Sequence, residues 1–387
     1  MNKLGVFSLA GAALVMCSSA NAAKLSAASA AQYAQGTYPE YFDLLKLPND
    51  AIVPADVRKN VEFLDAAFRK RGFITKQLKN DGKPMLFAEQ PNADPKRKTV
   101  LFYMHLDGQP VVPEQWDQKD PWEPVLKRRT TDDKWEEVDS AKLFNGSVDP
   151  EWRVFGRSSA DDKAPIMMLL ATMDAIKANG AAQGVNVKVI LDSEEEKGSP
   201  SINKVMSANK DLLRSDVIVI NDGPMHATNQ PTLIFGNRGA AQARLTVYGA
   251  KVPLHSGHYG NYSPNPAQRL ATLLASMKGD DGRVTIPGYY DRVKLTAADR
   301  KIMAAVPDDE AAIQKRLGIS NSDKVGNNYQ EAMQYPSLNV RGMASAAVGD
   351  KVATIVPDMA VAELDLRTTP ESDANYLTKL VETHIQK

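Results

Sequence analysis

The stretch Val185–Ser201, VNVKVILDSEEEKGSPS, predicts a buried strand that ends in an acidic run and a glycine turn. Apolar and polar residues alternate from Val185, the apolar residues then continue to Leu191, and three consecutive glutamates follow at 194–196. A run of like charges is usually only a solvated turn, because the charges repel one another and prefer water. A different role for these glutamates therefore needs support from the rest of the chain.

Two other stretches have the same form. KTVLFYMHLDGQP, at 98–110, predicts a buried strand whose apolar run stops at His105 and Asp107. SDVIVINDGP, at 215–224, predicts another strand that stops at Asp222. Three apolar strands thus each end, on the carboxyl side, in residues that can bind metal or move protons.

Helical segments separate these strands. Residues 24–95 look mainly helical, with apolar residues at helical spacing in Asn49–Arg71, and a strongly apolar helix is expected after Lys163, just beyond Asp161 and Asp162. The alternation predicts an α/β fold, a mostly parallel sheet with helices on both faces. The ligand crevice of such a sheet lies outside the carboxyl ends of its strands. The polar residues at these ends are therefore expected to converge on one site.

The chain is long enough for two domains. From residue 240 its character changes to an amphipathic strand (240–249), a glycine- and histidine-rich loop, a helix capped by Asn265, further strands and a final helix. This predicts an inserted α+β lid or dimerisation domain. Lys plus Arg and Asp plus Glu both total 47, so the balanced charge calls for neither nucleic acid nor an anionic membrane surface as partner.

The first 22 residues predict a secretory signal peptide. Lys3 precedes an apolar stretch, Leu4–Met16, and the small-residue triplet 20–22 suits cleavage. The domains predicted are a signal peptide at 1–22, a catalytic metal-binding domain at 23–239 and the lid domain at 240–387. Cys17, the only cysteine, leaves with the signal, and no second long apolar stretch follows. We expect an exported protein, periplasmic or secreted, with no membrane span and no catalytic thiol.

One imidazole and several carboxylates, without thiolates, form a ligand set that suits Zn²⁺ and tolerates Mn²⁺ or Co²⁺. This many carboxylates make a site for two divalent metal ions plausible. Such a pair polarises a carbonyl and generates hydroxide near neutral pH. A carboxylate beside the attacking water can take its proton and pass it to a leaving amine.

Seven motifs resemble, in order and spacing, those of the dinuclear zinc metallopeptidases of the carnosinase and aminoacylase type. The resemblance is closest to the dipeptidase branch and runs from about Pro39 to the end of the chain. The motifs are HLD, GRSSADDKAP, SEEEKGS, NDGP, LIFGNRG, LHSGHYG, and VATIVP followed by LDLRTTP.

The resemblance implies a role for each residue of the metal site. His105 and Asp222 would hold one metal, Asp161 would bridge, and Glu196 would hold the other. Asp107 would orient His105 and raise its basicity.

The resemblance also implies the groups that act on a small peptide substrate. Glu195 would be the general base, and Asp162 would follow a cis peptide bond. His255 would help stabilise the tetrahedral oxyanion from the partner subunit of a homodimer formed through the lid. Arg367 with Thr354 would grip the substrate's carboxylate or backbone.

The sequence departs from the family pattern in two ways. Ser158 and Ala164 stand where the family often has glycine, which is tolerated if the local backbone angles are ordinary. The family's returning C-terminal catalytic segment, with a last histidine ligand, is not found before Lys387. We therefore expect the isolated chain to hold its second metal weakly and to have little or no activity.

The sequence leaves three functions open. The first is a dipeptidase or other exopeptidase acting on short peptides, the second an amidohydrolase that deacylates N-acyl amino acids, and the third a non-catalytic periplasmic binding protein. A binding protein has no need for Glu195 beside Glu196, which favours the enzymes. Glu194, His226 and His258 are expected to be solvated residues without a role.

Overall fold

The computed structural model describes residues 26–387, except 81, 92, 133, 147, 181–182, 224, 227, 229, 231 and 235. The predicted signal peptide, 1–22, lies outside the described residues. The chain divides into two compact units between residues 224 and 225, earlier along the chain than the domain boundary predicted at 239/240. Each unit is described by itself.

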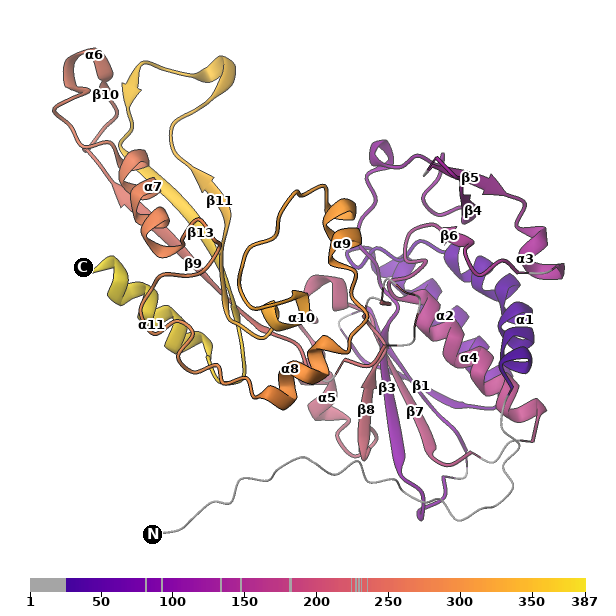
Figure 1. Ribbon diagram of the computed structural model, residues 1–387. Coiled ribbons are helices and arrows are strands. Elements are labelled where there is room, and N and C mark those ends of the chain that lie inside the picture. The colour runs from indigo at the N-terminus through magenta and orange to yellow at the C-terminus, as the bar shows by residue number, and fades with distance from the viewer. Residues whose placement is uncertain are drawn as a thin grey trace, which may run out of the picture. The chain divides into compact units, whose positions relative to one another are not determined.

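Unit 1, the residues before 225, is an α/β unit (Figure 1). Its helices are α1 (Ala27–Leu45), α2 (Pro54–Lys70), η1 (Pro113–Gln115), α3 (Ala141–Asn145), α4 (Lys163–Ala178), η2 (Glu195–Lys197) and α5 (Ile202–Ala208). Its strands are β1 (Ile74–Leu78), β2 (Met85–Glu89), β3 (Thr99–His105), β4 (Val125–Arg129), β5 (Trp135–Val138), β6 (Arg153–Phe155), β7 (Asn186–Asp192) and β8 (Val217–Ile220).

The main sheet of unit 1 has the strand order β1-β2-β7-β3-β8. Strands β7, β3 and β8 are parallel, whereas β1 and β2 form an antiparallel hairpin that continues antiparallel onto β7. The α/β class is confirmed, and its parallel part is the part that carries the predicted strand-end residues. The hairpin was missed because the short buried run of β2, MLFAE, does not by its periodicity distinguish a strand from a helix.

Helices cover both faces of this sheet. The larger apolar core lies between the sheet and the helices α1, α2 and α4, and it includes Leu64, Met104 and Leu170. A smaller cluster on the other face packs Val205 of α5 and Leu213 against strand residues of the sheet. Helices therefore pack on both faces of the sheet, as predicted.

Unit 2, Met225–Lys387, is built on a three-stranded antiparallel sheet of order β11-β13-β9. Its strands are β9 (Gly239–Tyr248), β10 (Leu254–His255), β11 (Ser337–Ala344), β12 (Ile355–Val356) and β13 (Met359–Thr368). Its helices are α6 (Ser256–Tyr259), α7 (Pro266–Met277), α8 (Ala297–Ala304), α9 (Glu310–Leu317), α10 (Tyr329–Ala332), η3 (Gly349–Lys351) and α11 (Ala374–Ile385).

The long central strand β13 gives unit 2 its core. Alternate residues of β13, from Ala360 to Leu366, are buried in one cluster with Leu270 of α7 and Leu377 of α11. The predicted start of α7 is confirmed, because the Asn265 side chain accepts a hydrogen bond from Ala267 N at 2.9 Å and Pro266 occupies the first turn. The opposite face of β13 carries the charged residues Glu363 and Asp365, which are half-buried.

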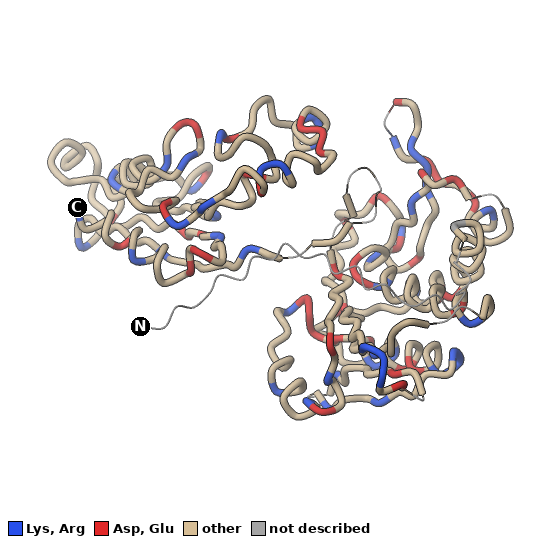
Figure 2. The backbone as a smooth tube through the Cα atoms, turned by 60° about the horizontal axis from the view of Figure 1, so that its bottom comes forward, with Lys and Arg blue, Asp and Glu red and all other residues tan. Residues whose placement is uncertain are grey.

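Two general features bear on partners. Basic and acidic residues are interleaved along the chain in both units, as Figure 2 shows, in keeping with the balanced composition. Within the described part of the chain, no helix has the length and apolar character needed to cross a membrane.

Candidate metal and catalytic site

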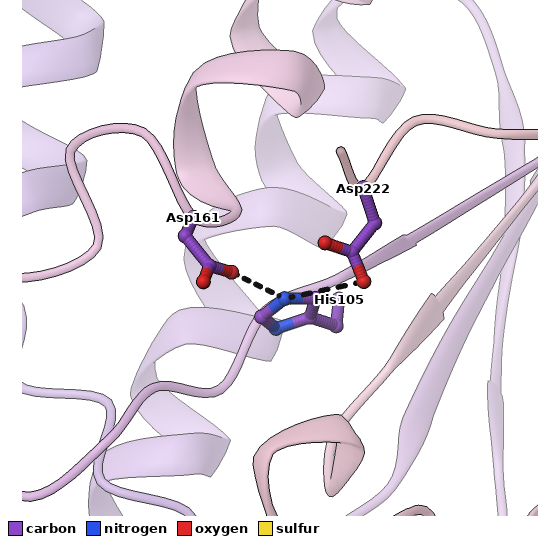
Figure 3. Close-up of side chains that lie close together, drawn as sticks. All are labelled: His105, Asp161 and Asp222. Carbon is purple, nitrogen blue, oxygen red and sulfur yellow. Dashed lines mark hydrogen bonds and ion pairs between the residues drawn. The ribbon is translucent and has the colours of Figure 1, made fainter. Parts of the chain in front are cut away.

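Three side chains meet at the carboxyl edge of the parallel strands in unit 1 (Figure 3). His105 is the last residue of β3, Asp222 follows β8, and Asp161 lies in the turn before α4. His105 Nε2 is 2.8 Å from Asp161 Oδ1 and 3.9 Å from Asp222 Oδ2. One potential ligand atom from each residue lies within 4.8 Å of the others, so the three could hold one metal ion.

Asp107 connects the imidazole to the glutamate turn. His105 Nδ1 lies 3.1 Å from the Asp107 carbonyl oxygen and 3.4 Å from Asp107 Oδ1. The two oxygens of the Asp107 carboxylate accept hydrogen bonds from the backbone N–H groups of Glu195 and Glu196, each at 3.1 Å. Because His105 and Asp107 are fully buried, this link fixes the imidazole relative to the turn that carries the glutamates.

Glu195 and Glu196 begin the 3₁₀ turn η2, directly after β7. Burial raises the pKa of both carboxyls, and neighbouring acidic groups add to the shift against an opposing effect of His105. Glu196 Oε2 also accepts a hydrogen bond from Gln109 Nε2 at 2.6 Å. Gln109 was not among the predicted site residues, although it follows the HLD motif by only two positions.

Several carboxylates surround the buried imidazole of His105, and of the three candidate ligands Asp161 is the most exposed, at 66%. Burial raises the pKa of Asp222, and it raises the pKa of Asp162 to about 8. Burial alone would lower the pKa of His105, but its hydrogen bond to Asp107 and the charges of Asp162, Asp107 and Asp222 raise it to about 10. Carboxylates crowded in this way around one imidazole form a donor set that a divalent cation would stabilise.

The turn between β6 and α4 holds Asp161 in place. The cis peptide bond predicted before Asp162 is present, and Asp162 Oδ2 accepts a hydrogen bond from His105 N at 2.9 Å. The condition of ordinary backbone angles is not met at Ser158, whose φ is +59°. Ser158 is buried, its hydroxyl exchanges hydrogen bonds of 3.1 and 3.2 Å with the Asn49 side chain, and these bonds stabilise the left-handed conformation.

Several of the residues expected to be solvated are not. Glu194 is buried, and although burial alone would raise its pKa, the contacts with Lys83 and Asn80 lower the pKa overall. His226 Nε2 lies 3.1 Å from Asp308 Oδ1, with both side chains largely enclosed. These partners could not be predicted from the sequence, since each lies far away along the chain.

A cavity of about 370 Å³ adjoins the site within unit 1. Asp161 and Glu196 line it, together with Gln109, Arg157 and Ser159. This volume is within the range of small-ligand sites in proteins. A short peptide therefore has room beside the candidate metal ligands.

The candidate substrate-binding residues of unit 2 occupy two separate places. His255 ends β10, and the next residue, Ser256, donates a hydrogen bond from its backbone N to Thr354 O at 3.1 Å. β10 pairs with β12, which ends at Val356, three positions before Met359 at the start of β13. Arg367 lies eight residues further along β13, about 27 Å from Met359 at the usual rise of a strand. Within one copy of unit 2, Arg367 and Thr354 therefore lie far apart.

Residues 235–387 match the model of the M20 peptidase dimerisation domain. The chain is 27% identical to the Cys-Gly metallodipeptidase dug1 of Schizosaccharomyces pombe, over 84% of this chain and 65% of that protein. It is also 27% identical to the Beta-Ala-His dipeptidase of Homo sapiens, over 78% of this chain and 56% of that protein.

The chain is thus similar in sequence to known metallodipeptidases, and its residues 235–387 match an M20 peptidase domain. An M20 family metallo-carboxypeptidase from Sulfolobus solfataricus has a similar structure, with a TM-score of 0.68 and 25% identity over 90% of this chain and 75% of that one. The chain thus spans about two thirds of the length of the S. pombe relative. M20 metallopeptidases use divalent metal, and the donor set of His105, Asp161 and Asp222 fits such an ion.

Proposed function

We propose that this protein hydrolyses the peptide bond of dipeptides or short peptides from a free end, as a metal-dependent exopeptidase. The convergence of His105, Asp161 and Asp222 at the carboxyl edge of the parallel sheet is the observation that carries this proposal. The likeness to metallodipeptidases supports the same reaction. A cavity beside these residues, large enough for a short peptide, fits the small substrate.

We propose two divalent ions, with Zn²⁺ the best match to a set of imidazole and carboxylate donors. His105 and Asp222 would hold one ion, Asp161 would bridge, and Glu196 would hold the other. Divalent ions held there would act as Lewis acids toward the scissile carbonyl and would make water acidic enough to attack near neutral pH. Because only Asp161 and Glu196 are assigned to the second position, that ion is expected to be held more weakly.

Glu195 would be the general base of the proposed reaction. Its carboxylate takes the proton from the attacking water and delivers it to the leaving amine, a task helped by a pKa that burial raises toward neutrality. The hydrogen bond from Glu195 N to Asp107 keeps the base beside the imidazole of His105. Asp107 in turn orients His105 through Nδ1.

Unit 2 would supply further groups that bind the substrate. We propose that the protein is a homodimer formed through this unit, in line with its match to a peptidase dimerisation domain. His255 would help stabilise the tetrahedral oxyanion on the substrate held by the partner subunit. Arg367 and Thr354 would bind the substrate's carboxylate or backbone.

We further propose that the mature protein is exported to the periplasm or beyond. The N-terminal pattern of one lysine, an apolar stretch and a small-residue triplet supports this localisation. Fractionation of cells that produce the whole chain, with N-terminal sequencing of the product, tests it. A product that still begins at Met1 in the cytoplasm would contradict it.

The substrate class is tested by incubating the metal-loaded chain with three panels: free dipeptides, dipeptides blocked at one end, and N-acyl amino acids. Because the second ion is expected to be held weakly, we expect hydrolysis of free dipeptides only with Zn²⁺ or Mn²⁺ in excess, and a chelator should abolish it. Faster turnover of N-acyl amino acids would assign a deacylase instead. Binding of peptides without turnover, whether or not metal is present, would contradict an enzyme altogether.

A further inference from the structure

The side chain of Glu194, the first of the three glutamates, lies in a different environment from the other two. Glu194 is only 6% exposed. Its Oε1 forms an ion pair with Lys83 Nζ, and its Oε2 accepts a hydrogen bond from Asn80 Nδ2 at 3.0 Å. Both partners belong to the turn between β1 and β2, so Glu194 joins that turn to the one after β7.

The Lys83 side chain is also largely buried and makes several contacts. Its side chain is 16% exposed, and its Nζ also donates to the Ala51 carbonyl oxygen at 3.0 Å. The Lys83 carbonyl oxygen accepts a hydrogen bond from Ser193 Oγ at 2.7 Å. The β1–β2 turn and the turn after β7 therefore contact each other through both backbone and side-chain atoms, next to Glu194.

The opposite side of the same turn is fixed by Asp107. Its carboxylate accepts hydrogen bonds from the backbone N–H groups of Glu195 and Glu196. The turn is thus held between two anchors, Lys83 through the Glu194 side chain and Asp107 through the backbone of the next two residues. A planar peptide bond joins Glu194 to Glu195, so a displacement of one is passed directly to the other.

We propose that Glu194 and Lys83 are positioning residues, whose buried ion pair sets where the carboxylates of Glu195 and Glu196 lie. Neither residue lines the cavity beside the site, and both act through the turn. The role in catalysis rests on the proposed function, because it matters only if Glu195 and Glu196 act on a substrate. Glu194 belongs to the SEEEKGS motif, whereas Lys83 lies outside every motif that carries the resemblance to known peptidases.

The kinetic test compares E194Q, K83M and the double variant K83M/E194Q with the wild type, all as the full chain loaded with Zn²⁺ and acting on a dipeptide that the wild type cleaves. Each single variant is expected to lower kcat about 10- to 100-fold, the usual effect of displacing a catalytic group by about 1 Å. KM is expected to change less than about threefold, because the pair does not touch substrate. The double variant should be no slower than the worse single variant, because the two residues act as one unit.

The matched control is K98M. It breaks the ion pair of Lys98 with Asp216, which is exposed and lies at the amino end of β3, away from the site. This variant should keep the wild-type kcat. E194D, which keeps the charge on a shorter side chain, should recover part of the activity lost in E194Q. Folded single variants with kcat within twofold of the wild type, or a double variant whose losses multiply, would overturn the proposal.

Amide hydrogen exchange supplies a readout that does not need turnover. In folded K83M, the peptide that contains residues 193–198 should exchange at least several times faster than in the wild type, whereas K98M should leave it unchanged. If the wild type cleaves no peptide at all, the proposed function fails, and this exchange decides the positioning role alone. Unchanged exchange in both K83M and E194Q would overturn it.

Discussion

At position 158, the glycine variant should be more stable than the alanine variant, the reverse of the usual order for these two residues. Ser158 has a φ of +59°, a region that costs a residue with a Cβ about 1–2 kcal/mol. The greater entropy of glycine in the unfolded chain opposes this by about 0.4–1 kcal/mol. The net result is that S158G should be more stable than S158A by about 1 kcal/mol.

Both variants also lose a buried interaction that the wild type keeps. The Ser158 hydroxyl accepts from Asn49 Nδ2 and donates to Asn49 Oδ1, which has no replacement partner once the hydroxyl is removed. An unsatisfied buried acceptor costs about 1–3 kcal/mol, so S158A should be destabilised by about that amount. S158G should lose less, because relief of the backbone conformation offsets part of the cost.

Thermal unfolding followed by circular dichroism measures the order. For a unit of this size, about 1 kcal/mol corresponds to about 2–4 °C in Tm, so S158G should melt about 2–4 °C above S158A and both below the wild type. Ser207, exposed within the helix α5, is the matched control, and there alanine should be the more stable replacement. If S158A is as stable as S158G, then a left-handed conformation at Ser158 is refuted.

Two other predictions concern unit 2. Glu331 is 2% exposed; burial alone would raise its pKa, but hydrogen bonds from Asn327 and Arg300 lower it overall below the ordinary 4.5. A carboxyl with a lowered pKa stabilises the fold above pH 4.5 and loses that contribution as the pH falls below this value. The free energy of unfolding should therefore fall more steeply with decreasing pH in the wild type than in E331Q. Equal steepness in the two proteins would contradict this. A Cβ at Gly257 would lie 2.9 Å from His255 Cε1. G257A should therefore displace the imidazole and lower kcat/KM by up to about 100-fold in a chain that stays folded, whereas unchanged kinetics would remove His255 from its proposed role.

The elements that carry the site could be predicted because their signals are local. The apolar runs that stop at His105, at Asp192 and near Asp222 predicted β3, β7 and β8, and the parallel order of these strands brings their ends together. The short β1–β2 hairpin was missed because a buried run of a few residues fits a strand or a helix equally well. That hairpin supplies Lys83, the partner that changes the interpretation of Glu194.

What the sequence could not show was pairing across long separations. Glu194 looked solvated because charge runs usually are, and only the fold brings Lys83 to it from the β1–β2 turn. The family resemblance assigned Arg367 and Thr354 to one substrate, and the sequence did not show how far apart they lie. The strand between them extends the chain by about 3.4 Å per residue, and this places them at opposite ends of the sheet.

The central claim is that Glu195 moves the proton in a metal-dependent hydrolysis. The most direct measurement is the turnover of one dipeptide by the wild type and by E195Q, each with its metal content determined in the same preparation. E195Q should bind as much metal as the wild type but turn over about 10²- to 10⁴-fold more slowly, the range expected for loss of a general base. Equal turnover by E195Q, at equal metal content, would contradict it.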